Sequence, residues 1–479
     1  MKVTVQVVTR TDDGQEITKD VGCVERDALT PATFGVSLAE GKSILEAIQE
    51  VVGEWQMHAY LHQQRHCPQC GKLRHSKGTH HIVFRTVFGA LPVESPRLTH
   101  CACQPHDTHS FSPLADLLPE HTTPELLYLE TKWAALTSYG TSAKLLQDVL
   151  PLDEPLQAVT IRNHVFTLAE RLEDALGDEH GSFIEGCPRD WGALPIPDGP
   201  LTVGIDGGYV KAQGGEQGWF EVIAGKSILA FRRDDEPSAP SGKCFAFVQT
   251  YDEKPKRRLF EVLQSQGLQM NQQIEFLSDG GDTVRDLQLY LSPEAEHLLD
   301  WFHITMRLTT LTQTAKGLPE KTTAEDARTL RDDVLRALER IKWFLWHGNV
   351  FRALQELRLV ESDLESAAWE SNNPTAQKLC KAVQEFSTYI ERHGGFIPNY
   401  GERYRNGERV STGFVESTVN YVVSKRMVKK QQMRWSQRGA HLLLQIRTRV
   451  LNGEWEATFR QWYPGFRTYT AAPAKFEAQ

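Results

Sequence analysis

The sequence has no apolar run that approaches the roughly 18 residues required to span a membrane, and it contains no internal repeat and no low-complexity tract. Residues 1–10 alternate between polar and apolar side chains as a strand does. They lack the apolar centre and the small-residue cleavage site of a signal peptide. The composition, with 40% hydrophobic and 24% charged residues, is typical of a soluble globular protein. We therefore expect a cytoplasmic protein with no membrane partner.

Positive charge is scarce overall, since Asp and Glu outnumber Lys and Arg and give a net charge of −9. Domains that bind nucleic acid are usually basic, so this balance argues against such a partner for the chain as a whole. Acidic residues are nevertheless absent between 417 and 450, where eight Lys or Arg residues occur. Here Arg426, Lys430, Arg434 and Arg438 recur at four-residue steps, so an unbroken helix would carry them along one face, together with Glu416. That face could contact DNA phosphates, or it could be an ordinary solvated basic face.

Cysteine is sparse and unevenly distributed, with four of the eight residues between 67 and 103. Cys67 and Cys70 form a Cys-x-x-Cys pair, and Cys101 and Cys103 form a Cys-x-Cys pair. Four thiolates at this spacing predict a structural Zn²⁺ site in a small zinc-ribbon-like module. Free thiols in a reduced cytoplasm are the alternative. The region also contains histidines that could replace a cysteine ligand, namely His66, His75, His80, His81, His100, His106 and His109.

The hydrophobic pattern divides the 479 residues into segments of different type, and the length suggests about three domains. Helices are expected at 124–136, 142–150, 160–172, 256–266 and 283–291, and throughout 303–392 and 414–450. Strands are expected at 201–206, 218–224, 228–232, 243–250, 273–278 and 296–299. Adjacent strands followed by alternating helices and strands predict a multidomain α/β protein with a mixed sheet.

Three acidic residues occupy positions suited to metal binding. Asp206 and Asp279 each end an apolar strand-like run and precede two glycines, whereas Glu416 lies in a mostly apolar face near the start of a helical segment. Carboxylates at the ends of buried strands converge at one edge of a sheet, and the glycines let a ligand approach. The set would supply the oxygen ligands that Mg²⁺ or Mn²⁺ prefers, which suits phosphoryl transfer. Taken singly, an Asp after a strand is more often a turn residue or a helix cap.

Four short stretches of the sequence resemble the catalytic domain of DDE transposases, which has an RNase H-like fold. They are Gly-Ile-Asp-Gly-Gly at 204–208, Phe-Leu-Ser-Asp-Gly at 276–280, Asp-Trp-Phe-His at 300–303 and Ser-Thr-Gly-Phe-Val-Glu-Ser at 411–417. The chain is most similar to the ISKra-type insertion-sequence transposases, relatives of the Mutator-like group.

The resemblance implies that Asp206, Asp279 and Glu416 are Mg²⁺ or Mn²⁺ ligands, and that Asp300 and His303 form an auxiliary motif near the active site. Alternatively, Asp300 only caps the next helix and His303 lies in its first turn. The implied reaction is cleavage of transposon-end DNA by water, followed by attack of the freed 3′-hydroxyl on target DNA. The implied partners are terminal inverted repeats, target DNA and further copies of the chain, so the protein would be nucleoid-associated when bound to DNA.

The resemblance also implies an order of domains. It consists of an N-terminal α+β segment (1–60), a zinc-binding module (61–115), a helix-turn-helix-like domain (116–175), a linker (176–200), the first part of an RNase H-like core (201–302), a helical insertion (303–398) and the core's C-terminal helix and tail (399–479). In the helical domain, residues 160–172 would be the recognition helix, with Arg162, Asn163 and His164 near the bases. Three packed helices of this size are also often purely structural.

Two other functions fit the same residues. A structure-specific nuclease would keep the RNase H-like fold and the carboxylates but would not join DNA ends. A non-catalytic DNA-binding protein derived from a transposase would bind DNA without metal-dependent cleavage.

Overall fold

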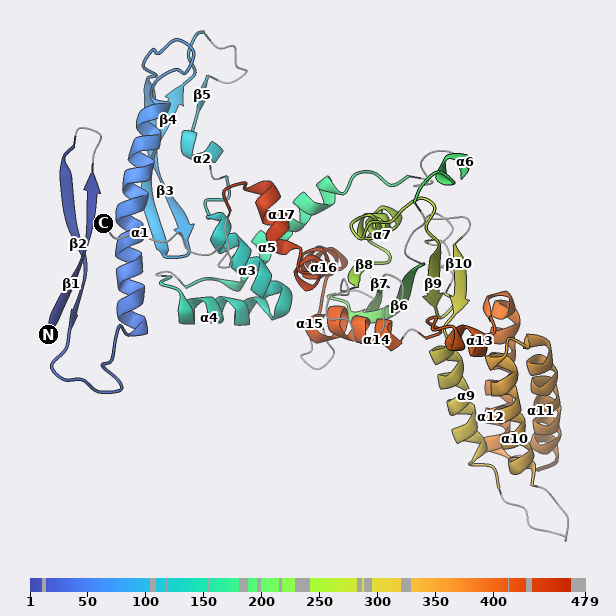
Figure 1. The fold of residues 1–479 in the computed structure, drawn as a ribbon. Coiled ribbons are helices and arrows are strands. Elements are labelled where there is room, and N and C mark those ends of the chain that lie inside the picture. The colour runs from blue at the N-terminus through green and yellow to red at the C-terminus, as the bar shows by residue number, and fades with distance from the viewer. Residues whose placement is uncertain are drawn as a thin grey trace. The chain divides into compact units, whose positions relative to one another are not determined.

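The computed structural model describes residues 1–10, 14–103, 109–117, 119–152, 155–180, 188–195, 200–214, 218–228, 242–281, 287, 295–319, 329–371, 373–411, 413–427 and 433–466. The chain forms two compact units (Figure 1). The first comprises residues 1–169 with the described residues from Gly453 onward, and the second comprises Glu170–Asn452, so the boundary falls within helix α5 (Ala158–Ala175). The segment from Gly453 onward therefore belongs to the first unit, although the sequence placed it with the predicted catalytic core.

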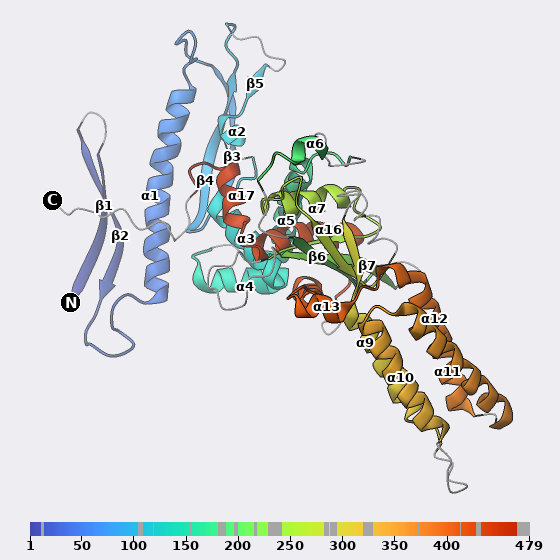
Figure 2. The ribbon, with the colours of Figure 1, turned by 45° about the vertical axis from the view of Figure 1, so that its right-hand side comes forward.

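In the first unit, the long helix α1 (Leu38–Gln64) lies between two small antiparallel sheets (Figures 1 and 2). A Cβ atom placed on Gly22 would lie 2.5 Å from Ile44 of α1, and one placed on Gly53 of α1 would lie 2.5 Å from Leu91, so glycine permits close contact on both sides. One sheet pairs β1 (Lys2–Arg10) with β2 (Glu16–Glu25), and the other contains β3 (Ser76–Thr86), β4 (Gly89–Thr99) and β5 (Ser110–Phe111).

Helices complete the first unit. The three that the sequence predicted are α3 (Pro124–Leu136), α4 (Tyr139–Val149) and α5, and α2 (Pro113–Leu117) and α17 (Trp455–Trp462) accompany them. The fully buried Trp455 of α17 donates its indole N–H to Thr131 Oγ1 of α3 at 3.2 Å, which fixes the C-terminal segment to this unit.

The second unit contains a mixed five-stranded sheet, which confirms the predicted mixed α/β class. Its strand order is β10 (Glu296–Leu299), β9 (Ile274–Ser278), β6 (Leu201–Lys211), β7 (Trp219–Ile228) and β8 (Lys243–Val248). Strands β6, β7 and β8 pair antiparallel, whereas β9 is parallel to both β6 and β10. The short helix α6 (Pro188–Trp191) precedes the sheet. The predicted helix at 283–291 lies outside the described residues except for Leu287.

The two faces of β6 contact different helices because successive side chains alternate. Val203 and Ile205 point into a core shared with α7 (Pro255–Gln264). The opposite face is covered by α14 (Gly413–Val419). There a Cβ atom on Gly204 would lie 2.1 Å from Val415, and one on Gly208 would lie 3.0 Å from Val419. Helix α14 is therefore seated directly on the backbone of β6.

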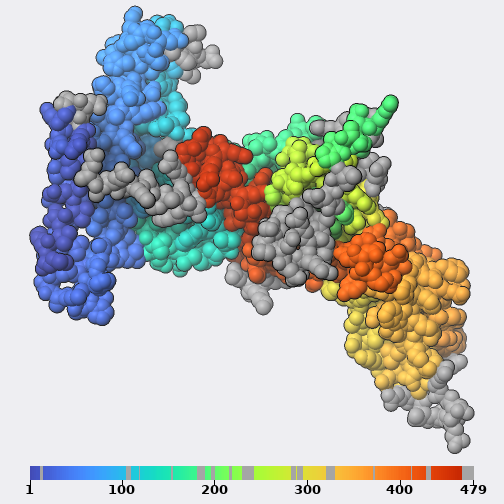
Figure 3. Space-filling view, in the orientation of Figure 1, coloured from blue at the N-terminus to red at the C-terminus, as the bar shows by residue number. Residues whose placement is uncertain are grey.

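Four helices form the predicted insertion and enclose a core of their own, which Figure 3 shows as a separate lobe of the second unit. They are α9 (Trp301–Ala315), α10 (Leu330–Trp346), α11 (Val350–Ser371) and α12 (Pro374–His393). The segment after them contains a 3₁₀ turn, η1 (Gly394–Phe396), and α13 (Tyr400–Arg405). None of the helices in the described part of the chain combines the length and the apolar character needed to cross a membrane.

The prediction of one helix over residues 414–450 is wrong. After α14 the chain widens into a π turn, η2 (Asn420–Ser424), and a single turn, α15 (Lys425–Met427). Trp435 then returns to the sheet, where its N–H donates to Lys211 O at 2.9 Å. A separate helix, α16 (Gln437–Leu451), begins at Ser436, whose side chain caps it.

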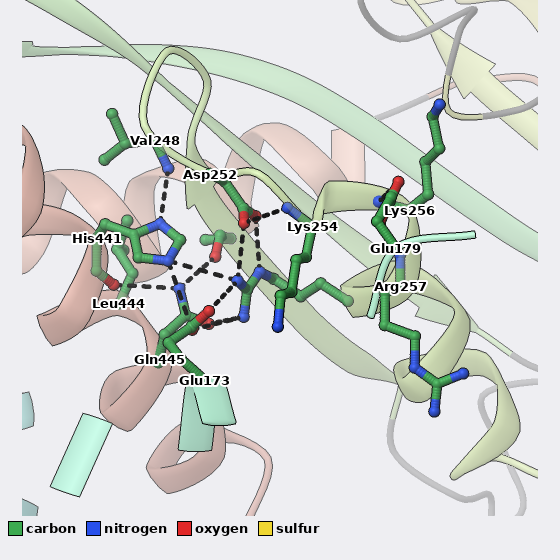
Figure 4. Close-up of polar contacts among 12 residues, drawn as sticks. Glu173, Glu179, Val248, Asp252, Lys254, Lys256, Arg257, His441, Leu444 and Gln445 are labelled. Carbon is green, nitrogen blue, oxygen red and sulfur yellow. Dashed lines mark hydrogen bonds and ion pairs between the residues drawn. The ribbon is translucent and has the colours of Figure 1, made fainter. Parts of the chain in front are cut away.

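A buried ionic network joins four elements of the second unit (Figure 4). The guanidinium of Arg258 in α7 is 7% exposed, and it donates to Asp252 Oδ2 at 2.8 Å, Glu173 Oε2 at 2.9 Å and Gln445 Oε1 at 2.6 Å. These partners come from the loop after β8, the last turn of α5 and α16. Two carboxylates hold the pKa of Arg258 above its ordinary value despite burial. The network fixes the last turn of α5 and α16 to the loop after β8 and to α7.

We predict that Arg258→Ala lowers the free energy of unfolding by about 3–5 kcal/mol, because it leaves two buried carboxylates without their cation. The matched control is Arg257→Ala, since Arg257 pairs with Glu261 and keeps 24% of its side chain exposed. That variant should lose about 1 kcal/mol or less. Urea denaturation measures both, and equal losses would contradict the role of the network.

Candidate functional site

The strand register brings three acidic residues to one level of the sheet. Gly204 of β6 lies opposite Leu277 of β9, so continuing that register by two residues places Asp206 beside Asp279. Asp300 follows β10 directly and donates its N–H to Ser278 O at 2.9 Å. It therefore lies beside the end of β9, which Asp279 follows. Strand β6 continues to Lys211, so Asp206 is within the strand rather than at its end. Asp206 and Asp279 nevertheless lie at one level, because β9 is shorter and ends at Ser278, beside the middle of β6.

The environment of Asp206 is strongly acidic. Its carboxylate accepts the N–H of Gly207 at 2.8 Å. Burial nevertheless raises the pKa of Asp206 above its ordinary value, the charges of Asp279 and Asp300 raise it further, and His303 opposes them. The group therefore favours a proton or another cation at this position.

Asp300 and His303 form a hydrogen-bonded pair at the start of α9. Fully buried Asp300 accepts the Phe302 N–H at 2.9 Å, which caps the helix, and its other oxygen contacts His303 Nδ1 at 2.7 Å. This bond raises the pKa of His303, and the charges of Asp206 and Asp279 add to the effect. The capping role is thus present, and the pair also faces the acidic group, while a catalytic role stays a prediction.

Glu416 lies apart from the position expected for it. Val415 and Val419 occupy the buried face of α14 against β6, so Glu416, one residue further round the helix, is exposed rather than in an apolar face. Among the described residues, metal-ligand spacing within 4.8 Å occurs in two groups, and neither contains Asp206, Asp279 or Glu416. The structure therefore brings Asp206 and Asp279 to the same edge and places Glu416 on the helix that covers it.

Two further residues of this site escaped sequence analysis. Glu221 of β7 lies so close to Gly207 that a Cβ atom there would be 2.5 Å from its Oε1, and burial raises the pKa of Glu221, with Asp279 and Asp206 adding to the rise. It is the one acidic residue of β7 and lies between apolar residues, which was a usable signal. Tyr389 donates its hydroxyl to Asp279 O at 3.0 Å. The two residues are 110 positions apart in the sequence, so no local pattern predicts the contact.

The predicted basic stripe is not formed. Arg426 is buried, with its guanidinium 5.2 Å from the centre of the Trp435 ring. Lys430 lies outside the described residues. Arg434 is exposed in the segment before α16, and Arg438 is exposed in the first turn of α16 and pairs with Glu170. The break in the helix therefore removes the common face on which the stripe depended.

The predicted recognition helix exposes two of its three base-reading candidates. Arg162 and Asn163 are exposed in α5, and Arg162 donates to Asn163 Oδ1 at 3.3 Å. His164 instead contacts the fully buried carboxylate of Glu130 and points into the helical core. DNA contact by Arg162 and Asn163 stays a prediction.

The four clustered cysteines of the first unit form a possible metal site. Cys67 Sγ lies 3.4 Å from Cys103 Sγ, and Cys70 Sγ lies 3.4 Å from Cys101 Sγ, with all four sulfurs within 4.8 Å of one another. A tetrahedral Zn²⁺ site with bonds of about 2.3 Å requires sulfurs about 3.8 Å apart, so the four fit such an ion. The backbone N–H of Cys70 lowers the pKa of Cys67 to about 6, which favours the thiolate. The group contains no histidine, although His106 lies outside the described residues.

The second group with ligand spacing is Glu173, Asp252 and His441 in the network of Figure 4. Here the Arg258 guanidinium already pairs with both carboxylates. Since that cation occupies the place of a metal, the group is satisfied as an ionic network.

We predict that the purified chain contains about one Zn²⁺, as expected for a closed four-thiolate site. Cys103→Ser should remove the metal and lower the unfolding temperature of the first unit. Cys23→Ser is the control, because Cys23 is exposed in the same unit and stands outside the cluster. Elemental analysis gives the metal content, and a full complement of zinc in Cys103→Ser would contradict the site.

We predict that Asp300→Asn lowers the pKa of His303 towards the ordinary value of about 6.5, because the amide still caps α9 but carries no charge. The raised pKa of His303 stabilises the folded state fully below about pH 6.5, and this stabilisation is lost as the pH rises through the pKa of His303 in the folded state. The variant should therefore lose stability mainly at low pH. NMR titration of His303 tests the first claim, and urea midpoints at about pH 6 and about pH 9 test the second. An unchanged titration would show that Asp300 does not control His303.

Comparison of the sequence with protein-family models and with curated proteins finds no match. The assignment of an activity therefore depends on the geometry of the acidic group and of the cysteine cluster.

Proposed function

We propose that the chain is a DDE transposase with an RNase H-like catalytic core in its second unit. The observation that carries the proposal is the convergence of Asp206, Asp279 and the Asp300–His303 pair at one level of a mixed sheet. All four residues belong to the motifs in which the sequence resembles this family. The proposed partners are DNA and further copies of the chain.

The sheet topology supports the proposal. The first three strands of the unit pair antiparallel in chain order, and β9 and β10 then add in parallel on the other side of β6. An RNase H-like sheet has this order. The helical insertion between β10 and α14 also supports it, since it accounts for the long interval between Asp279 and Glu416.

The acidic residues fit Mg²⁺ or Mn²⁺ in their chemistry. Asp279 and Glu416 are exposed, Asp206 is half-buried, and two glycines follow each aspartate. Divalent ions held by these residues would activate the attacking oxygen and stabilise the leaving one. Within the chain, His303 holds Asp300 by its hydrogen bond, and Gly207 orients Asp206.

One observation favours a non-catalytic DNA-binding protein as the second candidate. Glu416 faces solvent and lies in neither group with ligand spacing. A protein that had lost its catalysis would have no need to keep this carboxylate at the sheet edge.

We predict Mg²⁺- or Mn²⁺-dependent nicking of DNA that carries the element's terminal inverted repeats. Asp279→Asn should reduce cleavage at least about 100-fold, a loss comparable with that of one group that stabilises transition-state charge. DNA binding, measured by gel shift, should be unchanged. Asp333→Asn is the matched control, because its side chain is 49% exposed in the insertion.

The outcomes separate the candidates. Joining of a labelled DNA end to plasmid supports a transposase, whereas cleavage without joining indicates a structure-specific nuclease. DNA binding without any metal-dependent cleavage by the wild type indicates the non-catalytic protein. Normal cleavage by Asp279→Asn overturns the assignment of the site.

A further inference from the structure

The turn that carries Asp279 is held from outside the sheet. Asp279 is exposed and is followed by Gly280 and Gly281, which by themselves leave the backbone free to move. Within the turn, Asp279 Oδ1 accepts the N–H of Gly281 at 3.0 Å, so the direction of the carboxylate follows the conformation of the turn. Whatever fixes the turn therefore also fixes this carboxylate.

Helix α12 of the insertion supplies two side chains that contact the turn. The hydroxyl of Tyr389 donates to Asp279 O at 3.0 Å. One turn further along the helix, His393 Nε2 lies 3.1 Å from Gly280 O, and its Nδ1 lies 2.8 Å from Tyr389 O. The histidine ring thus links the end of β9 to the helix backbone.

The fit between the turn and α12 is close. Gly280 has a φ of +91°, and a Cβ atom placed there would lie 2.6 Å from His393 Cδ2. No side chain fits between the two. The rings of Tyr389 and His393 are 4.8 Å apart, so they form one contact surface.

The other side of Tyr389 is covered by α9. The guanidinium of Arg307 lies 4.2 Å from the centre of the Tyr389 ring. Arg307 is one helical turn beyond His303, which pairs with Asp300. The adjacent face of α12 is embedded in the core of the insertion through Val383, Phe386 and Ile390, and Tyr389 packs against the same core. The contacts to the turn therefore come from a rigid element.

We infer that Tyr389 and His393 are positioning residues, through which the helical insertion fixes the Asp279 turn and thereby sets the affinity of the carboxylate site for a divalent cation. The fixing of the turn stands on the contacts alone. The effect on cation affinity rests on the proposed function. The insertion would then be a part of the active site, although it supplies none of the proposed metal ligands.

The test compares the full-length wild type with Tyr389→Phe, which removes one hydroxyl and keeps the ring between Arg307 and His393. Tyr404→Phe is the control, because Tyr404 is 66% exposed on α13 and its ring packs beside Trp346, whereas the turn is contacted by Tyr389 and His393. Hydrogen exchange of the peptide that contains Gly280 and Gly281 should accelerate by about 3- to 10-fold in Tyr389→Phe, as expected for the loss of one hydrogen bond. The control and the global unfolding midpoint should be unchanged.

Mn²⁺ titration by calorimetry is the second measurement. Tyr389→Phe should weaken Mn²⁺ binding about 3- to 10-fold, and excess Mn²⁺ should restore its cleavage rate, which a general folding defect would not allow. Unchanged exchange, or unchanged Mn²⁺ affinity in a wild type that binds the ion, overturns the inference. Failure of the proposed function looks different, since the wild type itself would then show no Mn²⁺ binding that Asp279→Asn removes.

Discussion

The parallel pairing of β9 between β6 and β10 is the constraint on which the rest of the second unit depends. Because parallel strands run in the same direction, the ends of β9 and β10 fall at one level, next to the middle of β6. Asp279 and Asp300 follow those ends, and Asp206 lies at the matching position of β6. A shift of one residue in the β6–β9 register would turn Asp279 away from the face that carries Asp206. The register of β9 with β6 and β10 therefore determines that these acidic residues lie together.

The glycines of β6 set the second level of organisation. Gly204 and Gly208 lie on the same face of β6 as Asp206 but have no side chains of their own. Helix α14 therefore packs closely against the strand at these two positions through Val415 and Val419. This contact places Glu416 on the helix that covers β6 and turns it towards solvent. A helix that buries two valines against a strand has little freedom to rotate. An approach of Glu416 to the aspartates would therefore come from its flexible side chain.

Sequence reasoning succeeded where the signal was local and failed where it was not. The apolar run of β9, the start of α3 and the Cys-x-x-Cys pair each lie within a few consecutive residues, and the structure has them as predicted. The contact of Tyr389 with Asp279 spans 110 residues, so no window of the sequence contains both partners. The basic stripe failed for a related reason. Its four-residue period is real, but the burial of Arg426 against Trp435 is a tertiary contact that periodicity does not reveal, and the local cap at Ser436, which starts a new helix, was overlooked.

The balance of charge at the sheet edge differs from that in the Arg258 network. Asp206 is surrounded by Asp279, Asp300 and, through β7, Glu221, and His303 is the cationic partner that opposes them. Asp279 is exposed, and the pKa of Asp206 is raised first by burial and then by the charges of Asp279 and Asp300, so the negative charge at this edge exceeds what one histidine can offset. In the Arg258 network the opposite solution applies, because a guanidinium within the cluster satisfies its carboxylates internally. The two clusters differ in how well their cation matches the carboxylates around it, because Arg258 pairs with two carboxylates and His303 faces more. In the function that we propose, that difference is the reason why an external cation would bind at the sheet edge and stabilise the fold.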